Sequence, residues 1–258
     1  MIYIDIKGKR SFQGTEVRGG NKVCIMENET PINAGKTEIP MWVYTLFAWL
    51  MIGHFIYILG RCYLSGTLAD VFWISHIGTL IGGLGALFRS RFLISIALVS
   101  LLEHHLFWFI DTSLWIVTGD FPFGTTTYLK DAALGDWLQS ANHFFSVPAL
   151  LFLAYGRGGV EKNAWIWSTV LFAVLTIISA VWLPPDANVN AAHRLWPGLE
   201  QLHLAPLEQL PKGWYPLIVV ALNGLGNYLP VNLLLRVVYH YLLKRAHKFQ
   251  QTNTALHK

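Results

Sequence analysis

The chain has 258 residues, of which 53% are hydrophobic and only 13% are charged. An ordinary soluble domain is about 25% charged, so this composition excludes a soluble globular fold, which would need a larger polar surface. The net charge is +4, but the sequence has no cluster of Lys and Arg interleaved with aromatic residues. We therefore predict no nucleic-acid partner. The sequence predicts an integral membrane protein.

The chain begins with a polar segment. Residues 1–39 contain five acidic and six basic residues and no apolar run of the kind found in a signal peptide. We expect this segment to be a polar cytoplasmic N-terminal tail that precedes the membrane domain.

Six apolar stretches follow, each near the ~20 residues that a helix needs to cross the hydrocarbon core of a bilayer. They are Met41–Cys62, Ala69–Phe88, Phe92–Thr118, Asp136–Tyr155, Ala164–Leu183 and Trp214–Leu243. The predicted fold class is an all-α integral membrane bundle of about six transmembrane helices over residues 40–243. Pro148 and Pro230 lie inside the fourth and sixth stretches and are candidate kink positions.

The distribution of Lys and Arg predicts the orientation. With the N-terminus inside, the inner segments, including a basic tail at 244–258, carry fifteen Lys and Arg, whereas the outer segments carry four. The positive-inside rule then places both termini in the cytoplasm. The two longer loops, 119–135 and 184–213, lie outside, and the expected location is the bacterial cytoplasmic (inner) membrane.

Polar side chains inside the apolar stretches form a layer in the outer half of the predicted bilayer. A charged side chain at the bilayer centre costs at least ~2.5–3.5 kcal/mol, so such residues are functional candidates. The layer draws on five of the six stretches and comprises His54, His76, Glu103, His104, His105, Asp111, Asn142, His143, Asn223 and Asn227.

Three residues of this layer are candidate catalytic residues. We predict His143 as a general base or metal ligand, Asp111 as its orienting partner or co-ligand, and His104 as a supporting group. Imidazoles also hold Zn, non-haem Fe or haem, so His76, His104 and His143 form a candidate metal set. No established metal-binding motif such as H-E-x-x-H is present, and the cofactor stays undetermined.

Asn side chains are the candidate substrate-binding groups. Asn188 and Asn190, in the outer loop, would bind a headgroup or stabilise an oxyanion, and Asn142 lies next to His143. The alternative is that buried Asn, His and Asp side chains join helices through interhelical hydrogen bonds. Similarly, the small residues of Ile81–Gly85 (IGGLG) indicate close helix packing rather than a phosphate cradle.

One run of the sequence resembles a family. The segment Gly124–Leu151, GTTTYLKDAALGDWLQSANHFFSVPALL, is similar to a group of uncharacterised bacterial membrane proteins. In that group a Gly-x-Thr-x-Tyr-x-x-Asp turn precedes a Trp-Leu pair and a helix with Asn-His-x-x-x-Pro or Phe-His-x-x-x-Pro. Its Trp-x-x-Asp and Asn-Ile-Asn motifs correspond to Trp108–Asp111 and Asn188–Asn190, while His76 stands where the group usually has Asp.

The resemblance implies a shared constellation but no established function. The residues that it groups together are Asp111, Tyr128, Asp131, His143, Asn188 and Asn190. Tyr128 is on this basis a further candidate for substrate binding.

Two function hypotheses follow. The first is an intramembrane enzyme that acts on a lipid-like or apolar substrate from the outer leaflet. The second is a non-enzymatic accessory or assembly subunit of a larger membrane complex, in which the polar layer only joins helices. The expected partners are membrane lipids and, under the second hypothesis, other membrane subunits.

Overall fold

The computed structural model describes residues 39–195 and 213–256. The predictions for the N-terminal tail and for most of the 184–213 loop fall on residues 1–38 and 196–212, outside the described residues. The part that is described contains helices, turns and loops and no strand, which confirms the all-α prediction.

Eight α-helices follow one another in the described residues, with short 3₁₀-helices between some of them. The α-helices are α1 (Met41–Ser65), α2 (Ile74–Leu87), α3 (Arg91–Thr118), α4 (Leu134–Gln139), α5 (Asn142–Gly156), α6 (Ala164–Trp182), α7 (Trp214–Ala221) and α8 (Leu229–Leu256). The 3₁₀-helices are η1 (Leu68–Phe72), η2 (Thr127–Leu129), η3 (Pro185–Ala187) and η4 (Val189–Ala191).

Four helical segments are long and apolar enough to cross a membrane. They are α1, α3, α6 and the continuous segment Trp214–Phe249 that contains α7 and most of α8. All six predicted stretches contain helix, but α2 has only 14 residues, and the stretch Asp136–Tyr155 is divided into α4 and α5 at Ser140 and Ala141. The protein therefore has a helical membrane-protein fold, whereas the count of six spans and their orientation stay predictions.

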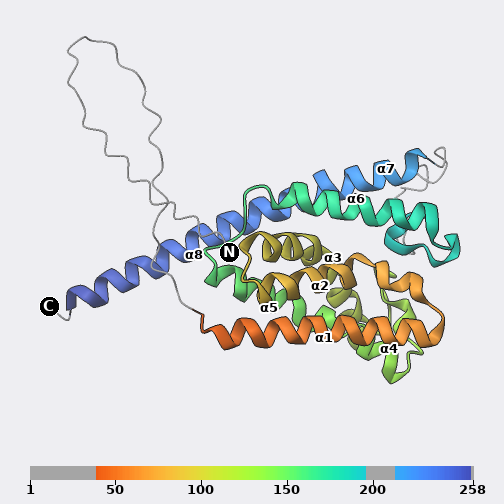
Figure 1. Ribbon diagram of the computed structural model, residues 1–258, viewed down its shortest axis with the longest axis horizontal. Coiled ribbons are helices and arrows are strands. Elements are labelled where there is room, and N and C mark those ends of the chain that lie inside the picture. Colours follow the sequence, from red (N-terminus) through yellow and green to blue (C-terminus); the bar gives the residue numbers. More distant parts are fainter. Residues whose placement is uncertain (1–38, 196–212, 257–258) are drawn as a thin grey trace, which may run out of the picture. The chain divides into compact units, whose positions relative to one another are not determined.

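Close packing of small residues places α2 in the centre of the bundle, in contact with both α1 and α3 (Figure 1). A Cβ atom added at Gly78 would lie 2.6 Å from Leu101 Cδ2, and one added at Gly83 would lie 3.0 Å from Met51 Cβ. These distances confirm the prediction that the glycines of α2 serve helix packing. The third helix, α3, also packs against α5 and α6.

Helix ends are determined by local residues. Ser90 accepts a hydrogen bond from Leu93 N and so caps the start of α3. Gly66 and Gly119 end α1 and α3 with φ of 73° and 83°, a conformation that glycine adopts without steric cost.

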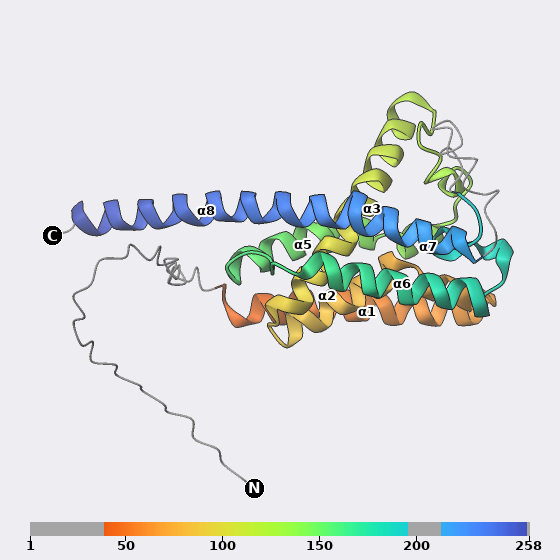
Figure 2. The ribbon, with the colours of Figure 1, turned by 90° about the horizontal axis from the view of Figure 1, so that it is seen from above.

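The last membrane segment accommodates its proline through a π-helix. Residues Leu222–Tyr228 are π-helical and end just before Pro230, which has no N–H to donate to the preceding turn. Figure 2 shows that α8 then runs past the ends of the neighbouring helices. Helix continues to Leu256, so the segment predicted as a basic tail is helical in its described part.

Candidate functional site

Two imidazole rings, from α3 and α5, lie against each other inside the bundle. The ring centroids of His105 and His143 are 4.3 Å apart, with 38° between the planes. His105 is only 2% exposed, and neither of its ring nitrogens has a hydrogen-bond partner among the described residues. Buried polar groups without partners are uncommon in folded proteins, so this pair is the strongest candidate site in the described part of the chain.

The ring of His143 is held from two sides. Its Nδ1 lies 2.9 Å from the carbonyl oxygen of Ser140, and the indole of Trp108 stacks on the ring at a centroid distance of 4.6 Å. Since a carbonyl oxygen only accepts, Nδ1 carries the hydrogen and the lone pair of the neutral ring is on Nε2. No described residue forms a hydrogen bond with Nε2, which leaves this nitrogen free to act as a base.

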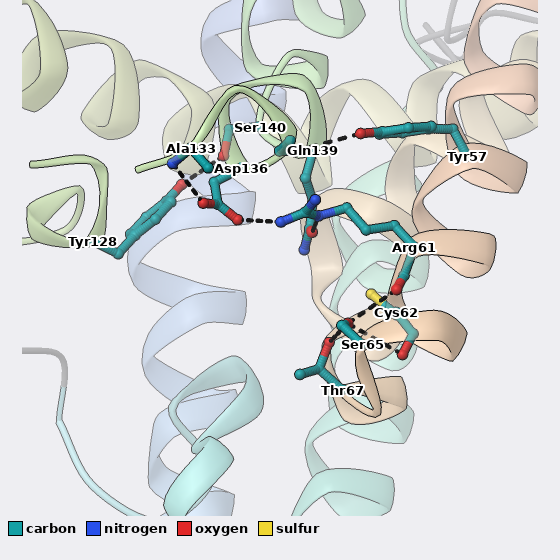
Figure 3. A network of polar contacts seen from close by, with 11 residues as sticks. Tyr57, Arg61, Cys62, Ser65, Thr67, Tyr128, Ala133, Asp136, Gln139 and Ser140 are labelled. Atoms are coloured by element: carbon teal, nitrogen blue, oxygen red, sulfur yellow. Dashed lines mark hydrogen bonds and ion pairs between the residues drawn. The ribbon is translucent and has the colours of Figure 1, made fainter. Parts of the chain in front are cut away.

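A network of hydroxyl and indole groups surrounds the pair. Trp108 Nε1 donates to the Tyr128 hydroxyl over 2.8 Å, and this hydroxyl lies 2.9 Å from Ser140 Oγ. Figure 3 shows the Tyr128 ring directed toward the start of α4 and Ser140. The contacts tie the 3₁₀-helix η2 to α3 and to the residue that orients His143, so Tyr128 acts on the site through Trp108 and Ser140.

Tyr128, in η2, is 52% exposed, but its hydroxyl is in hydrogen-bond contact with Trp108 and Ser140 and lies in the buried part of the side chain. This burial raises the pKa of Tyr128 above its ordinary value of 10.0, and the hydrogen bonds with Ser140 and Trp108 offset part of the rise. The folded protein therefore holds the phenol proton more tightly than the unfolded chain does. The resulting contribution to stability is present below the ordinary pKa and is lost as the pH rises through the folded pKa.

Replacement of Tyr128 by Phe is expected to remove this alkaline loss of stability. The melting temperature of the wild type in detergent should fall more steeply above pH 10 than that of Tyr128→Phe. A melting curve series at increasing pH on both proteins checks this. Parallel curves would contradict an enclosed Tyr128 hydroxyl.

Asp111 is directed toward the following turn rather than toward His143. It is 0% exposed, and its Oδ1 accepts from Phe123 N over 2.8 Å. Its Oδ2 accepts from Thr126 N and from the hydroxyls of Thr125 and Thr126, each over 2.9 Å. The structure gives Asp111 and His143 no hydrogen bond, because the turn occupies both carboxylate oxygens. The carbonyl of Ser140 fills the orienting role that we predicted for Asp111.

His104 lies on another side of α3 from His105, because successive residues of an α-helix differ by about 100° in direction. Its ring is stacked with that of Tyr228 at 6.3 Å, and its Nδ1 lies 3.0 Å from Glu103 Oε2. His104 is thus directed toward the π-helix and is not in contact with His143. The predicted supporting role of His104 has no geometric basis in these contacts.

The predicted metal set is not assembled in the described residues. No group of three His, Cys, Asp or Glu side chains there is arranged to hold a metal ion. The ring of His76 is instead directed to the η1 backbone, with Nδ1 2.7 Å from Asp70 O. Two imidazoles on opposite sides of one haem iron would have ring centres about 6 Å apart, given metal–nitrogen bonds of ~2 Å, so the 4.3 Å between His105 and His143 does not fit haem ligation by this pair.

The two loop asparagines shape the loop that carries them. Asn190 accepts from Ile74 N over 2.8 Å and donates to Phe72 O over 2.9 Å, which fastens η4 to the start of α2. Asn188 accepts from the backbone N–H groups of His193 and Arg194. Asn188 and Asn190 have positive φ angles, 43° and 56° respectively, which Asn tolerates better than most residues. We predicted that these two side chains bind substrate, but their amide groups form hydrogen bonds with the backbone of the loop and of its neighbours.

Asn142 differs from the loop asparagines. Its Nδ2 donates to Ser75 O over 3.1 Å and so joins α5 to α2, but its Oδ1 is buried without a hydrogen-bond partner among the described residues. Of the three predicted substrate-binding asparagines, Asn142 therefore keeps an acceptor that its own contacts do not use.

Side chains of α1 hold α4 in place next to the histidine pair, and we call these contacts the clamp. Arg61 pairs with Asp136 and donates through Nε to Gln139 Oε1 over 3.0 Å, and the Tyr57 hydroxyl donates to Gly135 O (Figure 3). Gln139 precedes Ser140, whose carbonyl orients His143. The sequence gives no local signal for this clamp, because Arg61 and Asp136 are 75 positions apart.

Comparisons with protein-family models, with curated proteins and with solved structures found no match to this chain. The family resemblance of the Gly124–Leu151 segment stays a prediction.

Proposed function

We propose that the protein is an intramembrane enzyme that acts on a lipid-like or apolar substrate, with His143 as its general base. One observation carries the proposal: the Ser140 carbonyl fixes the hydrogen on Nδ1 and leaves the Nε2 lone pair of His143 without a partner among the described residues. The one hydrogen bond of His143 is to a residue three positions earlier, so it joins no other helix to α5 in the described part of the chain. Intramembrane ionisable residues are functional candidates by default.

The surroundings of His143 suit proton transfer. When Nε2 takes a proton from a substrate hydroxyl or from an attacking water, the positive charge that forms on the ring is stabilised by the Ser140 carbonyl at Nδ1. The stacked face of Trp108, at 4.6 Å, adds a cation–π attraction. His105 places a second imidazole in contact with the first, so a proton has a neighbouring acceptor. General-base catalysis of this kind contributes about 10²–10⁴ to a rate.

The predicted orientation supports a substrate from the outer leaflet. With both termini in the cytoplasm of a bacterium and six helices across its inner membrane, the histidine pair would lie in the outer half of the bilayer. Arg89 and Arg91 would then lie at the inner surface, together with the basic residues of α8. An apolar or lipid-like molecule reaches such a site by lateral diffusion.

The test is a comparison of lipid extracts from bacterial membranes that contain the wild type, His143→Gln or His240→Gln. His240 is exposed on α8, so it is a matched control for the same substitution. We expect mass spectrometry to find a species that the wild type and His240→Gln deplete or form and that His143→Gln changes at least about 100-fold more slowly. If His143→Gln matches the wild type while its melting temperature is unchanged, His143 is not the base.

A second function has support from a different observation. The helix α8 runs past the ends of its neighbours (Figure 2), and its apolar side chains include Tyr241 and Phe249, which are 63% and 68% exposed. Such a helix suits an accessory subunit that binds a partner in a larger membrane complex. Purification from native membranes in mild detergent would then yield a stoichiometric complex that Tyr241→Glu with Phe249→Glu disrupts. Isolation of the wild type alone would contradict this alternative.

A further inference from the structure

The exposed face of α1 carries a groove near the C-terminal end of this helix. The groove has a volume of about 590 Å³ and is lined by one stretch of the helix, namely Ile56, Tyr57, Gly60, Arg61, Leu64 and Ser65. Gly60 leaves the groove open, because it has no side chain and a Cβ atom added there would meet nothing within 4 Å. The lining thus combines apolar side chains with a cation and a hydroxyl.

The position of α1 places these groups at different depths. The helix has 25 residues and is therefore about 37 Å long, longer than the ~30 Å hydrocarbon core. In a membrane-spanning α1, the polar side chains of Arg61 and Ser65 would place the last turns at the headgroup level. Ile56 would then lie more than one turn nearer to the apolar core than Arg61 does. The groove therefore has polar groups at one end and apolar side chains along the rest, which matches a lipid with a polar headgroup and an apolar chain.

The guanidinium of Arg61 keeps donors for a ligand. Nε donates to Gln139, and Nη2 pairs with Asp136, but no described residue accepts from Nη1. Nη1 lies against Gly135, where an added Cβ would overlap it, but the Arg61 side chain as a whole is 32% exposed and lines the groove. Arg binds phosphate oxygens through such paired N–H groups.

We infer that this groove binds a membrane phospholipid, with the phosphate on Arg61 and an acyl chain over Gly60 and Ile56. The inference does not depend on the proposed reaction at His143. Because Arg61 also clamps α4 ahead of Ser140, the bound lipid lies next to the segment that orients His143.

The test is native mass spectrometry of the full chain in detergent, titrated with dioleoylphosphatidylglycerol and separately with dioleoylglycerol, which has the same chains without phosphate. We expect one phosphatidylglycerol to bind with at least about tenfold preference over dioleoylglycerol, and Arg61→Gln to remove the preference. Gly60→Leu should weaken the binding of both lipids, since the new side chain would occupy the groove and its Cβ has open space around it.

Asp136→Asn separates the binding role of Arg61 from its clamping role. This variant loses the ion pair but keeps the guanidinium, so we expect phosphatidylglycerol to bind as tightly as in the wild type or more tightly. Equal binding of the two lipids by the wild type would overturn the inference. So would unchanged phosphatidylglycerol binding in both Arg61→Gln and Gly60→Leu, which would mean that the lipid binds elsewhere.

Discussion

Replacement of Asp111 by Ala is expected to lower the free energy of unfolding by about 3 kcal/mol or more. The carboxylate accepts hydrogen bonds from Phe123 N, Thr126 N and two threonine hydroxyls. Its removal strands two backbone N–H groups, and each buried donor without a partner costs about 1–3 kcal/mol. The turn at 121–126 should then detach from α3, and the environment of the neighbouring Tyr128 should change with it.

The measurement is thermal unfolding of the detergent-solubilised protein, followed by tryptophan fluorescence. Asp120→Ala is the matched control, because Asp120 lies nine residues further along and is exposed, and we expect it to unfold like the wild type. A second readout is limited proteolysis within 119–133, which should accelerate only in Asp111→Ala. If Asp111→Ala kept its stability but abolished the lipid change of the wild type, Asp111 would be a catalytic residue, as the sequence predicted, and not a support for the turn.

Replacement of Gly85 by Leu is expected to prevent correct packing of α2 against α3. A Cβ atom at Gly85 would lie 2.8 Å from the backbone nitrogen of Ile94 and 3.0 Å from Leu93 Cβ. Backbone atoms cannot turn away as a flexible side chain does, and only residues 88–90 connect the two helices. We therefore expect a loss of about 3 kcal/mol or more, seen as low yield of folded protein or as a strongly lowered melting temperature.

Gly53→Leu provides the control for the same change. Gly53 is exposed on α1, and an added Cβ there meets nothing within 4 Å. Leu has a helix propensity about 1 kcal/mol better than that of Gly, so the control should fold as well as the wild type or better. Size-exclusion chromatography in detergent and melting temperatures distinguish the two. Equal behaviour of both variants would contradict the close approach of α2 to α3.

The sequence predicted the class of protein and most helix positions, because these depend on local properties. Apolar runs of membrane-spanning length identified α1, α3 and α6 to within three residues at each end. The break between α4 and α5 was not visible in the sequence, since no glycine or proline marks Ser140 and Ala141. There, contacts of Arg61 and Tyr57 with α4 decide the local structure.

For the candidate site, the sequence predicted which residues lie at a similar level along the helices, and the tertiary structure determined which way each side chain points. Counting residues along each helix placed His105, Asp111 and His143 in one layer, because the rise per residue of a helix is fixed. It did not show which neighbour each side chain would meet, since that depends on how the helices rotate and pack against one another. Only packing brought His105 onto His143 and turned Asp111 toward the threonines of its own loop. A hydrogen bond requires a donor and an acceptor within about 3 Å, and only the tertiary structure determines a separation that short between different helices.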